Sequence, residues 1–169
     1  GISGDITAIT ATQAGVYKIS VTLEETDNYE WDGEAPDVFE WIISKASLEK
    51  IGNPADGEYA GSSQTVTLAN WNKNALNVSA IKGTTFGGAD ISVSAANENK
   101  ITLVHAGTYT FTVEITDKHN YEWADNTTAD ISVEYVMRRA TLSVNWGETS
   151  FKYDGSAKAP SPEVNGGTI

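Results

Sequence analysis

Carboxylate side chains gather in one stretch of the first third of the chain, and clustered oxygen ligands are what Ca²⁺ prefers in proteins. They are Glu24, Glu25, Asp27, Glu30, Asp32, Glu34, Asp37 and Glu40. The spacing from Asn28 to Gly33 matches part of an EF-hand loop, but the Glu that must close such a loop would fall at Phe39. We therefore expect a solvated acidic loop, with weak Ca²⁺ binding as the alternative. No metal site and no cofactor is assigned.

The chain offers few residues for nucleophilic or metal-assisted catalysis. It contains two histidines, His105 and His119, and no cysteine. A zinc site needs more ligands than these, and the lack of cysteine excludes disulfides and thiolate metal sites. Ser and Asp are plentiful, but no Gly-x-Ser-x-Gly motif places a serine nucleophile. We therefore expect no enzymatic activity and name no catalytic residue.

Three lysines near Asn-rich turns could form a Lys–Asn cross-link within the chain: Lys45, Lys50 and Lys100. Such a bond needs an apolar setting, which raises the pKa of a neighbouring carboxyl group and lowers that of the lysine. Lysine is rarely buried. We therefore expect ordinary solvated lysines.

Aromatic residues are the best ligand candidates. Tyr29 and Trp31 lie two apart, so on a strand they would share one face and could stack on a sugar ring. We favour a structural role for them, closing the edge of a β-sandwich or making a tyrosine-corner hydrogen bond. Trp71, in an Asn-rich turn, and Tyr59 are the candidate contacts for a glycan or protein ligand. For Trp71 we favour the structural interpretation, in which it covers the core.

These aromatic residues belong to an internal repeat with two slightly different displacements. Ala14-Gly15-Val16-Tyr17 and Asn28-Tyr29-Glu30-Trp31 return 92 positions later as Ala106-Gly107-Thr108-Tyr109 and Asn120-Tyr121-Glu122-Trp123. Ala46, Leu48 and Tyr59-Ala60-Gly61-Ser62 return 94 positions later as Ala140, Leu142 and Tyr153-Asp154-Gly155-Ser156. A period of this size indicates a tandem array of small domains, of which we expect this chain to be a segment.

Alternation of apolar and polar residues dominates the local pattern. Residues 17–23, 39–43, 109–115 and 131–137 each place apolar side chains on one face, which predicts strands with one buried side. Shorter strands are expected at residues 47–51, 64–69, 76–81, 90–95 and 101–104, with turns between them, including residues 82–88. Seven or so short strands in about 90 residues indicate an all-β, two-sheet antiparallel sandwich.

The expected core follows from the alternation. We predict that Tyr109, Phe111, Val113, Ile115, Val133 and Tyr135 are buried, and that Thr110, Thr112 and Glu134 face water.

The best domain boundaries fall at Lys45/Ala46 and Arg139/Ala140. Residues 1–45 would be the C-terminal half of one repeat, residues 46–139 a complete repeat, and residues 140–169 the N-terminal part of a further one. We expect residues 140–169 to pair with residues 1–45, of the same chain or of a neighbour. A permuted division into residues 1–90 and 93–169 is the alternative, and it would pair residues 16–23 with residues 46–90.

Charge and hydropathy argue against two classes of partner, nucleic acids and membranes. The net charge of -12 opposes binding to nucleic acid or to anionic lipid surfaces. No segment approaches the roughly 20 apolar residues that span a bilayer. We therefore expect neither nucleic-acid binding nor membrane insertion.

Several motifs together resemble the tandem Ig-like repeats of Gram-positive bacterial cell-surface proteins. They are residues 151–160 (FKYDGSAKAP), residues 106–109 (AGTY), the two NYEW motifs and residues 39–46 (FEWIISKA). The middle copy departs from the pattern, because residues 59–64 (YAGSSQ) lack the Asp and the Pro of residues 153–160.

The resemblance implies an Ig-like fold for each repeat and a location on the bacterial surface. The implied function is that of a structural or display segment in a rod-like stalk, adhesin or filament, with neighbouring repeats of the same or adjacent chains as partners. The alternative is an adhesion module that binds glycan or host protein.

Overall fold

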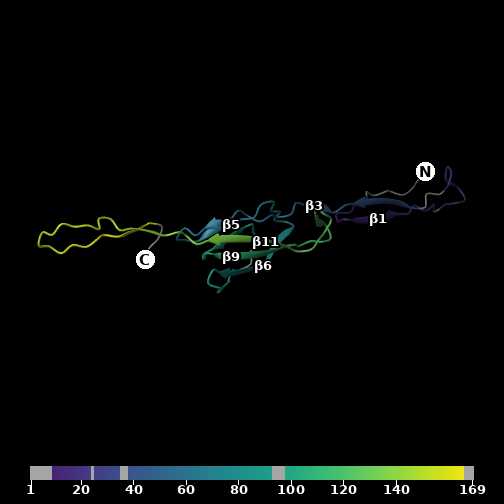
Figure 1. Cartoon of the computed structure of the whole chain (residues 1–169). Coiled ribbons are helices and arrows are strands. Elements are labelled where there is room, and N and C mark those ends of the chain that lie inside the picture. Colours follow the sequence, from purple (N-terminus) through teal and green to yellow (C-terminus); the bar gives the residue numbers. More distant parts are fainter. Residues whose placement is uncertain (1–8, 24, 35–37, 93–97, 166–169) are drawn as a thin grey trace. The chain divides into compact units, whose positions relative to one another are not determined.

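The structure of this protein, a computed structural model, describes residues 9–23, 25–34, 38–92 and 98–165. These residues form strands joined by turns and loops, so the fold is all-β, and Figure 1 labels the main strands. Two compact units contain residues 1–49 with 117–128, and residues 50–116 with 129–169. Within the described part of the chain, no helix has the length and apolar character needed to cross a membrane.

The second unit contains a five-stranded sheet in the order β4-β11-β9-β6-β7 (Figure 1). Its strands are β4 Gly57–Glu58, β6 Leu76–Thr85, β7 Asp90–Ser92, β9 Gly107–Ile115 and β11 Ile131–Arg138. β4 runs parallel to β11, and the other neighbours are antiparallel. The alternating stripes of residues 109–115 and 131–137 thus lie on adjacent strands, as a half-buried sheet requires.

A second sheet in this unit pairs β5 Gln64–Thr67 with β8 Lys100–Leu103 in antiparallel fashion. Its apolar side chains are buried, as are those of β9 and most of those of β11. The buried residues of these four strands include Val66, Ile101, Leu103, Tyr109, Phe111, Val113, Val133 and Met137. Full burial of each large apolar side chain stabilises the fold by roughly 1.5–3 kcal/mol.

The predicted core residues are all buried: Tyr109, Phe111, Val113, Ile115, Val133 and Tyr135. Glu134 is exposed, as predicted. Thr110 and Thr112 are half-buried rather than fully exposed. The reason is that β9 is a central strand with β6 on one side and β11 on the other, so its neighbours shield its polar face.

The turn predicted at residues 82–88 is partly wrong, because β6 continues through Thr85. Gly83 is part of the strand and is buried. A Cβ atom at Gly83 would lie 2.8 Å from Cδ1 of Tyr109 and 3.1 Å from Cβ of Ile91. This glycine therefore serves the close approach of β6 to a large side chain, and not a turn.

The first unit pairs β1 Gly15–Ile19 with β2 Phe39–Ile43 in an antiparallel hairpin, and β3 Ala46–Leu48 with β10 Tyr121–Trp123 in parallel. The strand predicted over residues 17–23 ends early, at Ile19, and Val21 is exposed. Residues 112–115 of β9 are held by β6, whereas no described strand pairs with residues 20–23. A strand continues only where a neighbour accepts its backbone hydrogen bonds.

A further hairpin pairs β12 Ser143–Asn145 with β13 Glu163–Asn165. The connecting segment contains Gly155, whose φ of 84° is close to the 82° of Gly61, 94 positions earlier. Among the described residues, β1 pairs with β2 and β12 with β13, so neither hairpin pairs with residues 46–90. The domain boundaries, and pairing of residues 140–169 with residues 1–45 of another chain, stay predictions.

Candidate functional site

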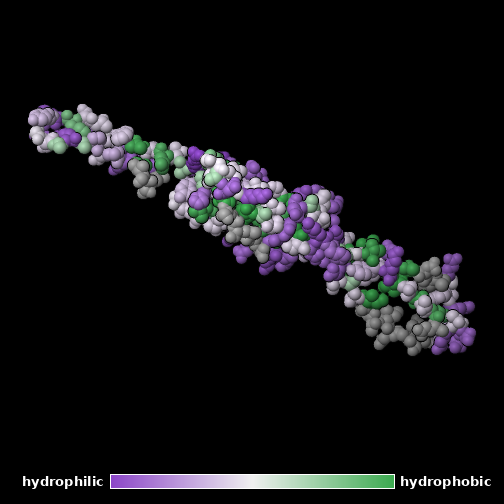
Figure 2. All heavy atoms as spheres, turned by 90° about the horizontal axis from the view of Figure 1, so that it is seen from below, coloured by the Kyte–Doolittle hydropathy of each residue, from purple (hydrophilic) through white to green (hydrophobic). Residues whose placement is uncertain are grey.

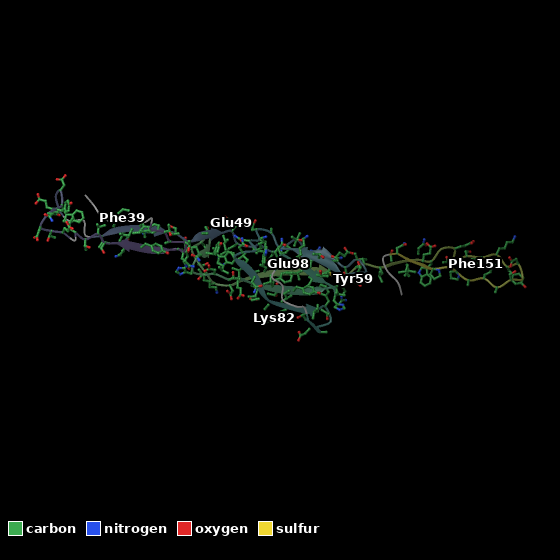
Figure 3. All side chains as sticks on the ribbon, turned by 180° about the vertical axis from the view of Figure 1, so that it is seen from behind. Phe39, Glu49, Tyr59, Lys82, Glu98 and Phe151 are labelled. Carbon is green, nitrogen blue, oxygen red and sulfur yellow. The ribbon has the colours of Figure 1, made fainter. Side chains whose placement is uncertain are left out.

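The two predicted ligand contacts lie in separate loops of the second unit. Tyr59 follows β4 directly, is half-buried, and its backbone N–H donates to the Arg138 carbonyl at 2.9 Å (Figure 3). Trp71 lies between β5 and β6 and is also half-buried. A role for either residue in ligand binding stays a prediction.

A pair of facing aromatic residues occurs both in the β1–β2 hairpin and in the antiparallel β9–β11 pair, and we call these two strand pairs the long hairpins. Tyr109 and Tyr135 face each other across β9 and β11, with ring centroids 6.5 Å apart. Tyr17 and Trp41 do the same across β1 and β2, with centroids 5.0 Å apart. Tyr109 lies 92 positions after Tyr17, and Tyr135 lies 94 positions after Trp41. Because these counterpart residues pair with each other in both cases, the two strand pairs have the same register.

The tyrosine of each Ala-Gly-x-Tyr motif also makes the same hydrogen bond in both copies. The Tyr109 hydroxyl donates to the His105 carbonyl at 2.5 Å, and the Tyr17 hydroxyl donates to the Gln13 carbonyl at 2.7 Å. Burial raises the pKa of Tyr109 above its usual value. The tyrosine of the Ala-Gly-x-Tyr motif thus makes a tyrosine-corner hydrogen bond. The edge-closing or tyrosine-corner role of the aromatic pair in the Asn-Tyr-Glu-Trp motif stays a prediction.

The Asn-Tyr-Glu-Trp motif instead forms a turn with a defined backbone pattern. The Asp117 carbonyl accepts hydrogen bonds from the N–H groups of Asn120 and Tyr121, at 3.3 and 3.0 Å. In the first copy the Glu25 carbonyl accepts the equivalent bonds from Asn28 and Tyr29, at 3.2 and 3.1 Å. Both copies therefore form the same turn.

After this turn, Trp123 enters the core of the first unit and is fully buried, so it cannot stack on a sugar. In the first copy Tyr29 is exposed and Trp31 is half-buried. The structural role that we favoured for the motif is thus confirmed for Trp123.

Hydrogen bonds join the turn at residues 117–124 to Ala14 and to residues 45–48, and we call this contact the Asn120 junction. The Ala14 N–H donates to Asn120 Oδ1 at 2.7 Å, and the Ala46 N–H donates to the Asn120 carbonyl at 2.8 Å. Lys45 Nζ donates to the Lys118 carbonyl at 2.8 Å, and the Ala124 N–H donates to the Leu48 carbonyl at 2.8 Å.

The side chain of Asn120 holds the junction together. Its Nδ2 donates to Asp117 Oδ2 at 2.7 Å, which leaves its Oδ1 as an acceptor directed at Ala14. This hydrogen bond, together with those from the backbone N–H groups of Asn120 and His119, holds the pKa of Asp117 below its usual value. Leu48 is buried at the parallel pairing of β3 with β10.

The sequence marks some members of this junction as recurring positions of the repeat, but it does not indicate that they contact one another, and it gives no signal for Asp117 or Lys118. The repeat alignment marks Asn120 and Leu48 as recurring positions, and this was the available signal. The parallel pairing was not predicted, because it depends on which backbone edges meet and not on side-chain periodicity.

The described members of the acidic run are all exposed: Glu25, Asp27, Glu30, Asp32, Glu34 and Glu40. Glu24 and Asp37 lie outside the described residues. Glu40 forms an ion pair with Lys18 at 3.3 Å across the first hairpin. In the described part of the chain, no three His, Cys, Asp or Glu residues lie close enough together to hold a metal ion.

The remaining polar candidates are at the surface. His105 and His119 are exposed, as are Lys45, Lys50 and Lys100. The buried setting that a Lys–Asn cross-link requires is therefore not present at these three lysines.

Large apolar side chains are exposed in the hairpins that precede and follow residues 46–139, and Figure 2 shows green patches, which mark residues of positive hydropathy, at the surface of these segments. They include Phe39 and Ile42 of β2, and Leu142, Trp146, Phe151 and Tyr153 around β12; Phe39 and Phe151 are labelled in Figure 3.

Comparisons with protein-family models, with curated proteins and with solved structures gave no match.

Proposed function

We propose that this chain is a structural and display segment of an extracellular bacterial surface protein. In this proposal the chain consists of Ig-like β-sandwich repeats arranged in a rod-like stalk, adhesin or filament. Its role is mechanical, holding other parts of its protein away from the cell. The observation that carries the proposal is the common strand register of the β1–β2 and β9–β11 hairpins.

A second correspondence supports the repeat. In the β12–β13 hairpin Val144 pairs with Val164. Their counterparts 94 positions earlier, Lys50 and Asn70, are joined by a hydrogen bond from Asn70 Nδ2 to the Lys50 carbonyl at 3.4 Å. Residues of the second and third sequence copies thus contact their counterparts' partners, as repeats of one module are expected to do.

The composition of the site supports a structural role over a chemical one. The recurring residues are aromatic pairs, turn-forming asparagines and buried apolar side chains, which stabilise strands and turns.

Surface labelling tests the location. An antibody raised against this chain should label intact cells of the source organism, and protease treatment of the intact cells should remove the label. An antibody against a cytoplasmic protein is the control, and it should react only after lysis. Label that appears only after lysis would refute surface display.

Single-molecule pulling tests the modular architecture. Stretching the chain from its ends should unfold residues 46–139 in one main step, with a gain in contour length of about 300 Å, the extended length of roughly 90 residues less the folded span. Several small steps with no main event would contradict a cooperative module.

A further inference from the structure

The parallel pairing of β4 with β11 determines how the second unit responds to tension. β4 comes early in the sequence of this unit, and β11 ends its five-stranded sheet. Because the two strands run parallel, the chain enters the pair at one end and leaves it at the other. Tension along the chain therefore pulls β4 and β11 in opposite directions along their length. In an antiparallel hairpin the entry and the exit lie at the same end, so its bonds separate one after another.

Three contacts hold residues 53–59 along β11. The Glu134 N–H donates to Asn53 Oδ1 at 2.8 Å, and the Tyr59 N–H donates to the Arg138 carbonyl at 2.9 Å. The Arg138 guanidinium group forms an ion pair with Asp56 at 2.7 Å. These contacts are spread along the two segments, so sliding one segment past the other stretches all of them together.

The ring of Tyr135 lies against the backbone of β4. A Cβ atom at Gly57 would overlap the Tyr135 hydroxyl oxygen and would lie 3.2 Å from Cζ of that ring. A glycine is therefore needed at this point of the pairing. The next residues, Glu58 and Tyr59, both carry a Cβ atom.

The position of Gly57 blocks sliding in the direction that tension favours. Tension toward the N-terminus moves β4 so that later residues approach the place of Gly57. Side chains of a strand alternate between its faces, so the next register that restores the faces lies two residues on. That register puts Tyr59 in the place of Gly57, with its Cβ atom directed at the Tyr135 hydroxyl group. Steric overlap closes this register, so β4 cannot relieve the load by slipping along β11.

We propose that the β4–β11 pairing is a latch that bears tension in shear, with Tyr135 as the stop that prevents β4 from sliding. The latch consists of Asn53, Asp56, Gly57, Tyr135 and Arg138. It gives the mechanical role proposed above a structural basis and rests on that proposal. When the latch breaks, the rest of the sheet unfolds in the same step.

Constant-force pulling of the whole chain from its ends tests the stop. Tyr135→Phe removes the hydroxyl oxygen and keeps the ring, so a side chain on β4 can pass after a small shift. The rate of the main unfolding step should rise by at least about 10-fold, which corresponds to about 1.4 kcal/mol of barrier.

Tyr109→Phe is the matched control, because the Tyr109 hydroxyl group donates to the His105 carbonyl on the neighbouring strand of the same aromatic pair. This bond is still formed when the latch breaks, and an interaction that is intact in the transition state leaves the unfolding rate unchanged. The rate of Tyr109→Phe under force should therefore stay within about 2-fold of the wild type.

Urea unfolding separates a latch from an ordinary stabilising contact. Tyr135 and Tyr109 are both buried, and both variants lose one hydroxyl group. Their urea midpoints should therefore differ by less than about 0.5 M. A merely structural role for Tyr135 would change the two variants alike under force as well.

A second matched pair tests the bonds along β11. Asn53→Ala removes the acceptor of the Glu134 N–H, whereas Asn53→Asp keeps an oxygen in that place. Asn53 is exposed, so both variants should keep the wild-type circular dichroism spectrum. Asn53→Ala should raise the unfolding rate under force by about 5-fold, the effect of one hydrogen bond, and Asn53→Asp should stay within about 2-fold of the wild type.

Equal rates for Tyr135→Phe and Tyr109→Phe under force would overturn the proposal, and so would an Asn53→Ala rate equal to that of the wild type. Unfolding without a main step would overturn both the latch and the cooperative module. A main step that none of these variants changes would overturn the latch alone. Surface labelling tests the cellular location independently, so its failure and failure of the latch are separate results.

Discussion

Glycines at equivalent positions of the two long hairpins should respond differently to the same substitution. Gly107 begins β9 and is buried, and Gly15 begins β1 and is half-buried. A Cβ atom at Gly107 would lie 2.5 Å from the Thr84 carbonyl oxygen and 3.0 Å from Cδ1 of Ile91. At Gly15 the nearest atom is the Tyr17 hydroxyl oxygen at 3.6 Å, which is an ordinary contact.

Gly107→Ala should therefore lower the free energy of unfolding by about 2–3 kcal/mol, the upper part of the usual range for overpacking. The clash is with backbone of β6, which cannot move without breaking its ladder with β9. Gly15→Ala should be neutral or stabilise by up to about 1 kcal/mol, because alanine restricts the unfolded chain.

Urea unfolding followed by circular dichroism measures the first effect, and the midpoint for Gly107→Ala should fall by about 1–2 M. Hydrogen exchange of the β1 amides measures the second effect locally. A Gly107→Ala midpoint within about 0.3 M of the wild type would refute the close packing of β6 on β9. Equal losses at both glycines would refute the difference between the hairpins.

Three further outcomes follow from the core and from the titrating groups. Phe111→Ala should lower the free energy of unfolding by about 3–5 kcal/mol, because the side chain is fully buried; a loss below about 1 kcal/mol in urea unfolding would contradict this. Burial raises the pKa of Tyr109 and Tyr135, so their contribution to stability is fully present below the unfolded pKa of about 10 and is lost as the pH rises through the higher folded pKa. The urea midpoint should accordingly fall between about pH 9 and 11, and Tyr153→Phe, which changes an exposed residue, should leave that fall unchanged. We also expect folding to need neither metal nor cross-link: intact mass should equal the sequence mass with no loss of ammonia or water, and a melting temperature that climbs steeply with added Ca²⁺ would contradict the prediction for metal.

The sequence by itself determined the strand class and much of the core. Alternation through Tyr109, Phe111, Val113 and Ile115 identified β9 and its buried face, because side chains of a strand point to opposite sides of the sheet at every second residue. The 92- and 94-residue displacements identified positions that turned out to have matching neighbours, such as Tyr17 and Tyr109. Such inferences need only residue types and spacing, because the burial of a strand face depends on local backbone geometry.

Only the tertiary structure decided which strand edges pair with each other. Gly83 reads as a turn residue in the sequence, but the ring of Tyr109 beside it makes it a strand residue. Residues 20–23 have the same alternation as residues 112–115, yet among the strands that the structure describes, a neighbour pairs only with residues 112–115. The parallel contact of residues 46–48 with residues 121–123 joins segments more than 70 positions apart. Backbone hydrogen bonding carries no side-chain pattern of its own, so the choice of partner is made by the packing of the whole chain.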